Sequence, residues 1–147
     1  MTARLIYTSR AHELTPAAFA LLMKQSRLNN HKAGIRGGLA ILGGVFLQYL
    51  EGEVAELDRL YAAIQIDPRH TGLRLLERRE NVTSFFDGWA MAELSWTDET
   101  RSIFFSFSPG KPLDLYEIDG DTAAPMFRAW AKTSAWTGTP PIDRVRC

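Results

Sequence analysis

Two polar side chains occur where the surrounding sequence predicts buried β-strands. Tyr7 lies in residues 3–9, and Gln48 interrupts the apolar run of residues 45–50. A phenol and a carboxamide each donate and accept hydrogen bonds, and a buried amide is costly unless its neighbours satisfy it. Together they could bind a heterocyclic ring that carries carbonyl oxygens and ring nitrogens. A lone tyrosine in a strand is usually a packing residue, so Gln48 is the stronger indication of a ligand site.

Further polar residues follow the two helices that the pattern predicts. Asn29, Asn30 and Lys32 come at the end of the first, and Arg69 and His70 come just after the second. Arginine and lysine suit anionic oxygens such as phosphates. Two alternatives remain open, because Asn30 could cap the first helix and the Arg69–His70 pair could be a solvated helix end.

The elements that must position these residues can be predicted from periodicity and turn signals. Thr15 and Pro16 open a helix, and Gly43-Gly44 predicts a hairpin between two apolar runs. The predicted strands are residues 3–9, 35–42, 45–50, 72–79 and 89–95, and the predicted helices are residues 16–28 and 53–66. The order is β-α-β-β-α-β-β, which predicts an α+β ferredoxin-like sandwich with an added strand and both helices on one sheet face.

Strand alternation leaves an apolar set on the opposite face of the sheet, namely Ile6, Val45, Leu47, Tyr49, Ala90, Ala92 and Leu94. Such a face needs a cover. Residues 121–134 predict a helix that can supply it. We therefore expect residues 1–100 to form the main domain and residues 101–147 to be a helical extension packed on it, with residues 137–147 loosely held.

Composition excludes several classes of protein. The chain has 147 residues, with 17 basic against 17 acidic side chains, so bulk charge gives no reason to expect nucleic acid binding. Its one cysteine, Cys147, allows no intramolecular disulfide and no cysteine-based metal site, and we expect no metal. No signal peptide or membrane span is evident, so the expected location is the cytoplasm.

Five motifs, taken in order, resemble those of BLUF domains, the sensors of blue light that use FAD. They are Tyr7-Thr8-Ser9, Asn29-Asn30, the run from Val45 to Gly52 with Gln48 before Leu50-Glu51-Gly52, Asp67-Pro68-Arg69-His70, and Phe85-Phe86-Asp87-Gly88-Trp89-Ala90-Met91. Two positions depart from the family pattern. Arg36 replaces a usual threonine, and Ala40-Ile41-Leu42 lacks a usual aromatic residue.

The resemblance implies that FAD binds non-covalently between the two helices, with FMN or riboflavin as possible substitutes. Tyr7 would deliver an electron and a proton to the excited flavin, and Gln48 would then rotate or tautomerise. Asn30 would hold the O4/N3 edge of the flavin. The remaining cofactor contacts implied are Ser9, Asn29, Phe46 and Ile64, with Lys32, Arg69 and His70 at the phosphates.

The same resemblance implies a sensor and not an enzyme. The signal would leave through Trp89 or Met91 and the C-terminal region towards an unidentified downstream signalling protein, since no effector domain is fused. A homo-oligomer is also expected, without membrane or nucleic acid. Two hypotheses from other classes stay open: a ferredoxin-like interaction module without photochemistry, and an acylphosphatase-like hydrolase that would use Arg10 and His12.

Overall fold

The computed structural model of the protein describes residues 2–84, 86 and 90–138. Six strands form one sheet in the order β4-β1-β3-β2-β5-β6, and among these described strands the β2–β5 pair alone is parallel. The elements are β1 (Thr2–Ala11), α1 (Pro16–Ala33), β2 (Arg36–Leu42), β3 (Val45–Glu53), α2 (Val54–Gln65), β4 (His70–Glu80), β5 (Ala92–Leu94), α3 (Asp98–Phe107), η1 (Leu115–Glu117), α4 (Gly120–Ala131) and β6 (Trp136–Gly138). This arrangement confirms the predicted α+β ferredoxin-like fold.

Local sequence signals account for the ends of α1 and for the β2–β3 hairpin. The Thr15 side chain accepts a hydrogen bond from the backbone N–H of Ala18 at 3.1 Å, and Pro16 is the first helical residue. At the other end Gly34 takes a left-handed conformation, with φ of 70°. The turn Gly43-Gly44 has φ values of 59° and 75°, which residues with a side chain rarely adopt, so the predicted hairpin is confirmed.

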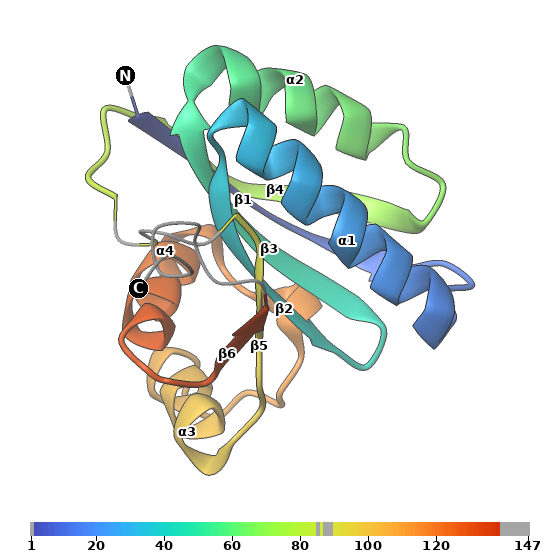
Figure 1. Ribbon diagram of the computed structural model, residues 1–147. Helices are drawn as coiled ribbons and strands as arrows, with labels where there is room; N and C mark the ends of the chain where they lie inside the picture. The colour runs from blue at the N-terminus through green and yellow to red at the C-terminus, as the bar shows by residue number, and fades with distance from the viewer. Residues whose placement is uncertain (1, 85, 87–89, 139–147) are drawn as a thin grey trace.

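The register of the central strands brings the two residues of interest together. Tyr7 of β1 lies directly opposite Gln48 of β3, and Gln48 is in turn opposite Leu39 of β2. Both α1 and α2 lie on one face of this sheet (Figure 1). Because side chains alternate along a strand, Tyr7 and Gln48 point together towards these helices.

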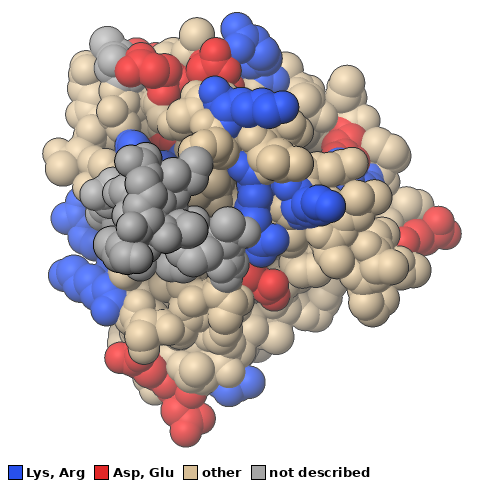
Figure 2. All heavy atoms as spheres, in the orientation of Figure 1, with Lys and Arg blue, Asp and Glu red and all other residues tan. Residues whose placement is uncertain are grey.

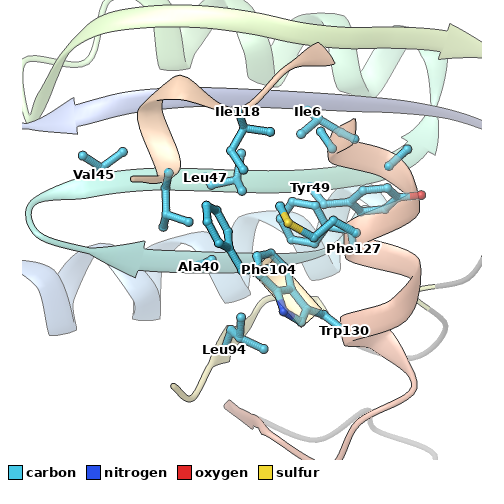
Figure 3. Packing of buried hydrophobic residues seen from close by; sticks show 14 of the residues in the cluster. Ile6, Ala40, Val45, Leu47, Tyr49, Leu94, Phe104, Ile118, Phe127 and Trp130 are labelled. Atoms are coloured by element: carbon cyan, nitrogen blue, oxygen red, sulfur yellow. The ribbon is translucent and has the colours of Figure 1, made fainter. Parts of the chain in front are cut away.

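The other face of the sheet carries a second, aromatic-rich core. Helices α3 and α4 and the η1 turn lie on this side (Figure 1). Phe127 and Trp130 of α4 and Phe104 of α3 point towards the strands, as Figure 3 shows. The cluster includes residues predicted on this face: Ile6, Val45, Leu47, Tyr49 and Leu94. The predicted C-terminal cover of the open face is therefore present.

Three details of the sequence prediction were wrong. The last core strand was expected over residues 89–95, but β5 covers only Ala92–Leu94. The first helix was expected over residues 16–28, but α1 continues to Ala33 and includes Asn29, Asn30 and Lys32. The tail from residue 137 was expected to be loosely held, whereas Trp136–Gly138 pairs with β5 as β6, and residues 139–147 lie outside the described part.

Candidate functional site

A cavity of about 170 Å³ lies between α1, α2 and the sheet. Its walls are largely apolar, and polar groups occur at its floor and rim. The lining residues are Tyr7, Leu22, Met23, Gln25, Ser26, Asn29, Asn30, Leu39, Phe46, Gln48, Leu60, Ala63, Ile64, Asp67, Arg69, His70 and Met91. A mostly apolar cavity with a few convergent polar groups is the usual form of a small-molecule site.

The floor of the cavity holds three side chains joined by hydrogen bonds. The Tyr7 hydroxyl donates a hydrogen bond to Oε1 of Gln48, and Nε2 of Gln48 donates to the sulfur of Met91 at 3.4 Å. All three side chains are buried. Burial, followed by the charge of Asp67, raises the pKa of the Tyr7 hydroxyl well above its ordinary value. Tyr7 therefore keeps its proton at neutral pH.

Asn30 links α1 to the segment that enters β5. Its side-chain Nδ2 donates to the backbone carbonyl of Ala90 at 2.8 Å, and Nε of Arg27 donates to the carbonyl of Met91 at 3.4 Å. The C-cap position of α1 is instead taken by Gly34. The alternative that Asn30 merely caps its helix is therefore wrong.

The rim of the cavity carries a balanced pair of charges. Arg69 binds Asp67 through two guanidinium nitrogens, with Nη2 2.7 Å from Oδ2, and its Nη1 donates to Oε1 of Gln25 on α1 at 3.1 Å. Hydrogen bonds from Arg69 hold the pKa of the Asp67 carboxyl below its ordinary value. Arg69 thus bridges the loop after α2 to α1 across the rim.

His70 and Ser9 lie together at one end of the cavity. Nδ1 of His70 is 2.7 Å from Oγ of Ser9, and Nε2 is 2.7 Å from the carbonyl oxygen of Ile64. The His70 ring also meets the edges of two aromatic rings, with centroids 6.1 Å from Tyr7 and 6.4 Å from Phe46. Both ring nitrogens are therefore engaged within the protein.

Most of the predicted site residues meet at this cavity, with three exceptions. Lys32 is exposed on α1 and does not line the cavity. Ser9 is buried behind His70 and reaches the site only through it. Trp89 lies outside the described residues.

Arg36, which departs from the family pattern, has an ion-pair partner on the face of the sheet opposite the cavity. Nε of Arg36 donates to Oε1 of Glu51 at 3.1 Å, and the Glu51 side chain is fully buried. Glu51 also accepts from the Tyr49 hydroxyl at 2.9 Å and from Ser84. Arg36 therefore neither charges the cavity nor points freely to solvent.

Several lining residues were not predicted from the sequence. Leu22, Gln25 and Ser26 recur with the predicted Asn29 at intervals of three and four along α1 and so share a face. A polar stripe within an otherwise apolar helix face was the signal that could have identified them. On α2, Leu60 and Ala63 were not predicted, and they follow the same spacing with the predicted Ile64.

The lining fits the isoalloxazine ring of a flavin. Aliphatic side chains from both α1 and α2 line the cavity and can contact a flat aromatic ring, and the Gln48, Asn29 and Asn30 amides supply donors and acceptors. Among the described residues, no cluster of His, Cys, Asp or Glu could hold a metal ion. The chemistry of the lining thus suits an organic heterocycle.

A family model that covers the strands and helices around the cavity supports this interpretation. The model described as sensors of blue-light using FAD, BLUF, matches residues 2–92. The protein belongs to the BLUF family. This BLUF domain is therefore a blue-light photoreceptor that uses FAD, and the family is one of sensory modules and not of enzymes. Consistently, Arg10, considered for a hydrolase, lies over the Tyr116 ring at 3.9 Å and does not line the cavity.

Known proteins similar to this BLUF domain are also light-responsive. Photoactivated adenylate cyclase subunit beta of Euglena longa is 30% identical over 93 residues, which are 61% of this sequence and 11% of that protein. The dark-state structure of BlrB, a BLUF protein, is 27% identical and has a TM-score of 0.71, covering 90% of this sequence and 97% of BlrB. The photo-activated state of BlsA, at 22% identity and a TM-score of 0.83, covers 95% of this sequence and 100% of BlsA and shows the shared fold.

Two features of the surface bear on possible partners. Figure 2 shows basic and acidic side chains both present on the viewed face, in keeping with a formal net charge of zero. No described helix is long and apolar enough to cross a bilayer. The matched region spans a small part of the cyclase relative, so that protein's activity is not transferred to this one.

Proposed function

We propose that light sensing in this BLUF domain depends on Tyr7 as the donor of an electron and a proton and on Gln48 as the group that changes orientation. The buried Tyr7–Gln48–Met91 hydrogen bonds at the cavity floor are the observation that carries the proposal. Bound FAD supplies the absorption of blue light and, when excited, the capacity to accept an electron and a proton. Tyr7 suits the donor role because its hydroxyl is neutral, buried and already hydrogen-bonded.

Gln48 suits a two-state role because its amide has two ends with opposite hydrogen-bonding character. In the present orientation its oxygen faces Tyr7 and its nitrogen faces the sulfur of Met91. Sulfur is a weak acceptor, so the Gln48–Met91 contact costs little to break. Loss of the Tyr7 proton removes the donor that holds the Gln48 oxygen, and rotation or tautomerisation of the amide can follow.

The proposed cofactor contacts divide into three groups. Asn30, with Asn29, would meet the polar edge of the flavin, and Phe46 and Ile64 would contact its ring. Arg69 is the proposed phosphate contact at the rim, where it would exchange Gln25 for an anionic oxygen. FMN and riboflavin would fit the same ring pocket, because all the proposed contacts except Arg69 would be made to the ring.

The proposed output runs from Met91 into β5 and then to the C-terminal region. β5 pairs with β6, and the Trp136 indole of β6 donates to the carbonyl of Trp130 in α4 at 2.8 Å. We propose that residues 101–147 form an extension of the same domain and present the signal to a downstream protein or to a second copy of this protein. A cytoplasmic location stays a prediction.

An absorption experiment tests the proposed function. The purified protein should show a flavin spectrum that shifts slightly to the red in blue light and recovers in the dark. Gln48→Ala should keep the flavin and lose the shift, whereas the matched variant Gln25→Ala, at the rim, should keep both. A protein that stays colourless after incubation with FAD would instead favour the ferredoxin-like interaction module.

A further inference from the structure

His70 makes two internal hydrogen bonds that fix its tautomer. The Ile64 oxygen is a carbonyl and can only accept, so Nε2 of His70 carries a hydrogen and donates across 2.7 Å. In the neutral ring Nδ1 is then the acceptor, and the Ser9 hydroxyl donates to it across 2.7 Å. Both nitrogens are thus committed to protein groups and not to a ligand.

The Nε2 bond completes the C-terminal end of α2. Helix α2 ends at Gln65, so the Ile64 carbonyl lacks the intrahelical partner found four residues later in a longer helix. It accepts instead from the backbone N–H groups of Ile66 and of Asp67, the latter at 3.1 Å, and from His70. A histidine near the end of a helix can cap its last carbonyls in this way. His70 therefore holds the turn that carries Ala63 and Ile64 of the cavity wall.

The Nδ1 bond ties the same ring to the strand that carries Tyr7. Ser9 is fully buried and follows Tyr7 by two residues on β1, so both point to the same side of the sheet. The His70 ring meets Tyr7 at an interplanar angle of 64° and Phe46 at 68°, both edge-on. One imidazole thus connects β1, β4 and the end of α2 around the cavity.

We propose that His70 is a positioning residue of the flavin site, held as the Nε2–H tautomer, and that it does not bind the phosphates of FAD. It acts by fixing the last turn of α2 and the Ser9 end of β1, which shape the ring pocket. This assignment replaces the phosphate role expected from the sequence. It rests on the proposed function in one respect, since the ligand is taken to be a flavin.

A comparison of ligands with and without phosphates separates the two roles. For His70→Ala, the dissociation constants of riboflavin, FMN and FAD should all rise by the same factor, on the order of tenfold for the loss of about one net hydrogen bond and its neighbours. His31→Ala, an exposed histidine on α1, is the matched control and should change none of them. A loss that grows from riboflavin to FAD would overturn the proposal and restore the phosphate role.

A readout without ligand tests the tautomer itself. The protein has three histidines, so the imidazole nitrogen resonances can be assigned by single substitutions. His70 should show a protonated Nε2 and an unprotonated Nδ1, and His70→Ala should speed hydrogen exchange of the Asp67 amide that shares the Ile64 carbonyl. The opposite tautomer, or unchanged exchange at Asp67, would overturn the proposal.

A conservative variant guards against simple unfolding. His70→Gln retains an amide donor that can reach the Ile64 carbonyl, so it should restore slow exchange at Asp67 and part of the riboflavin affinity. If the protein binds no flavin, the proposed function fails while the nitrogen resonances and the exchange rates still decide the role of His70. A His70→Gln protein that resembles His70→Ala in both measurements would count against the capping contact.

Discussion

Met91 and Gln48 meet across an intervening strand, with the sulfur of Met91 3.4 Å from Nε2 of Gln48. Gln48 belongs to β3 and Met91 directly precedes β5, while β2 lies between these two strands in the sheet. The contact therefore connects the Tyr7–Gln48 pair to a short strand that has two residue pairs with β2 on one side and the edge strand β6 on the other. This contact is the proposed route from Gln48 to β5.

Met91→Leu should remove the hydrogen bond from Gln48 to the sulfur while a side chain of similar volume still fills the core. The exchange conserves volume and should cost less than about 1.5 kcal/mol of unfolding free energy. We expect the light-induced red shift to persist, because Tyr7 and Gln48 remain, and the light-induced amide shift changes in β5 and β6 to fall by at least half. Met23→Leu, another buried methionine that lines the cavity, is the control and should keep them. Undiminished changes in β5 with Met91→Leu would refute the route.

Stability should fall at alkaline pH because of two buried phenols. Burial raises the pKa of Tyr7 and of Tyr49 in the folded protein, and Glu51 adds to the effect at Tyr49. The unfolded protein loses these protons near the ordinary tyrosine pKa of 10.0. The stability is therefore fully present below about pH 10 and declines above it, by about 1.4 kcal/mol per pH unit for each phenol.

Urea unfolding at a series of pH values checks this expectation. Tyr7→Phe and Tyr49→Phe should each reduce the loss of unfolding free energy above about pH 10 by about 1.4 kcal/mol per pH unit. The double variant should reduce it by twice that amount. Equal slopes for the wild type and Tyr7→Phe would show that the Tyr7 phenol titrates alike in the folded and unfolded states.

The central part of the fold could be predicted because each signal is local. Gly43-Gly44 requires positive φ values, Thr15-Pro16 starts a helix, and strand alternation places Tyr7 and Gln48 on one face. These features depend on residues within a few positions of each other. Their agreement is why Tyr7 and Gln48 were predicted to face the helices, whereas Phe46 was implied by the family resemblance and Leu39 was not predicted.

The remainder depends on contacts between distant parts of the protein. β6 forms because Trp136–Gly138 pairs with the edge of β5. A strand of three residues has too short a pattern to be predicted from sequence. The bonds of His70 to Ser9 and to Ile64 join three elements, so a helix-end motif alone suggested a solvent or phosphate contact. Only the assembled sheet shows that Arg36 faces Glu51.

Arg36→Thr, which restores the residue usual in the family, should destabilise this protein. It removes the cationic donor to the fully buried Glu51 and leaves that carboxylate with Tyr49 and Ser84. The expected loss is about 1.5–3 kcal/mol, the range for a hydrogen bond to a charged group. Flavin affinity should stay within about twofold, because Arg36 lies on the sheet face opposite the cavity.

A double-mutant cycle with Glu51→Gln isolates the Arg36–Glu51 interaction. Once the carboxylate is neutral, the loss of Arg36 should matter less, so the double variant should be less destabilised than the sum of the single variants by about 0.5–3 kcal/mol. Additive effects would show that Arg36 acts through another group. Weakened flavin binding by Arg36→Thr would place its influence in the pocket.

Trp130 tests whether residues 101–147 unfold together with the flavin-binding part. Its side chain is fully buried in α4, its indole N–H donates to the Thr100 carbonyl at 3.1 Å, and its ring meets the rings of Phe127 and Trp96 edge-on. Because these contacts belong to the core behind the central strands, Trp130→Ala should cost about 3–5 kcal/mol of unfolding free energy. Flavin release and loss of helical signal should then still occur in one urea transition, at a lower midpoint.

The control for Trp130→Ala is Phe105→Ala, which truncates an exposed aromatic side chain of α3 and should move the urea midpoint little. A single transition in both variants means that the extension and the flavin-binding part share one cooperative core, as the packing of Trp130 against the sheet requires. Two separate transitions in Trp130→Ala, with flavin retained through the first, would mean that the extension folds as an independent unit. The proposed output route through α4 would then lose its rigid connection to the sheet.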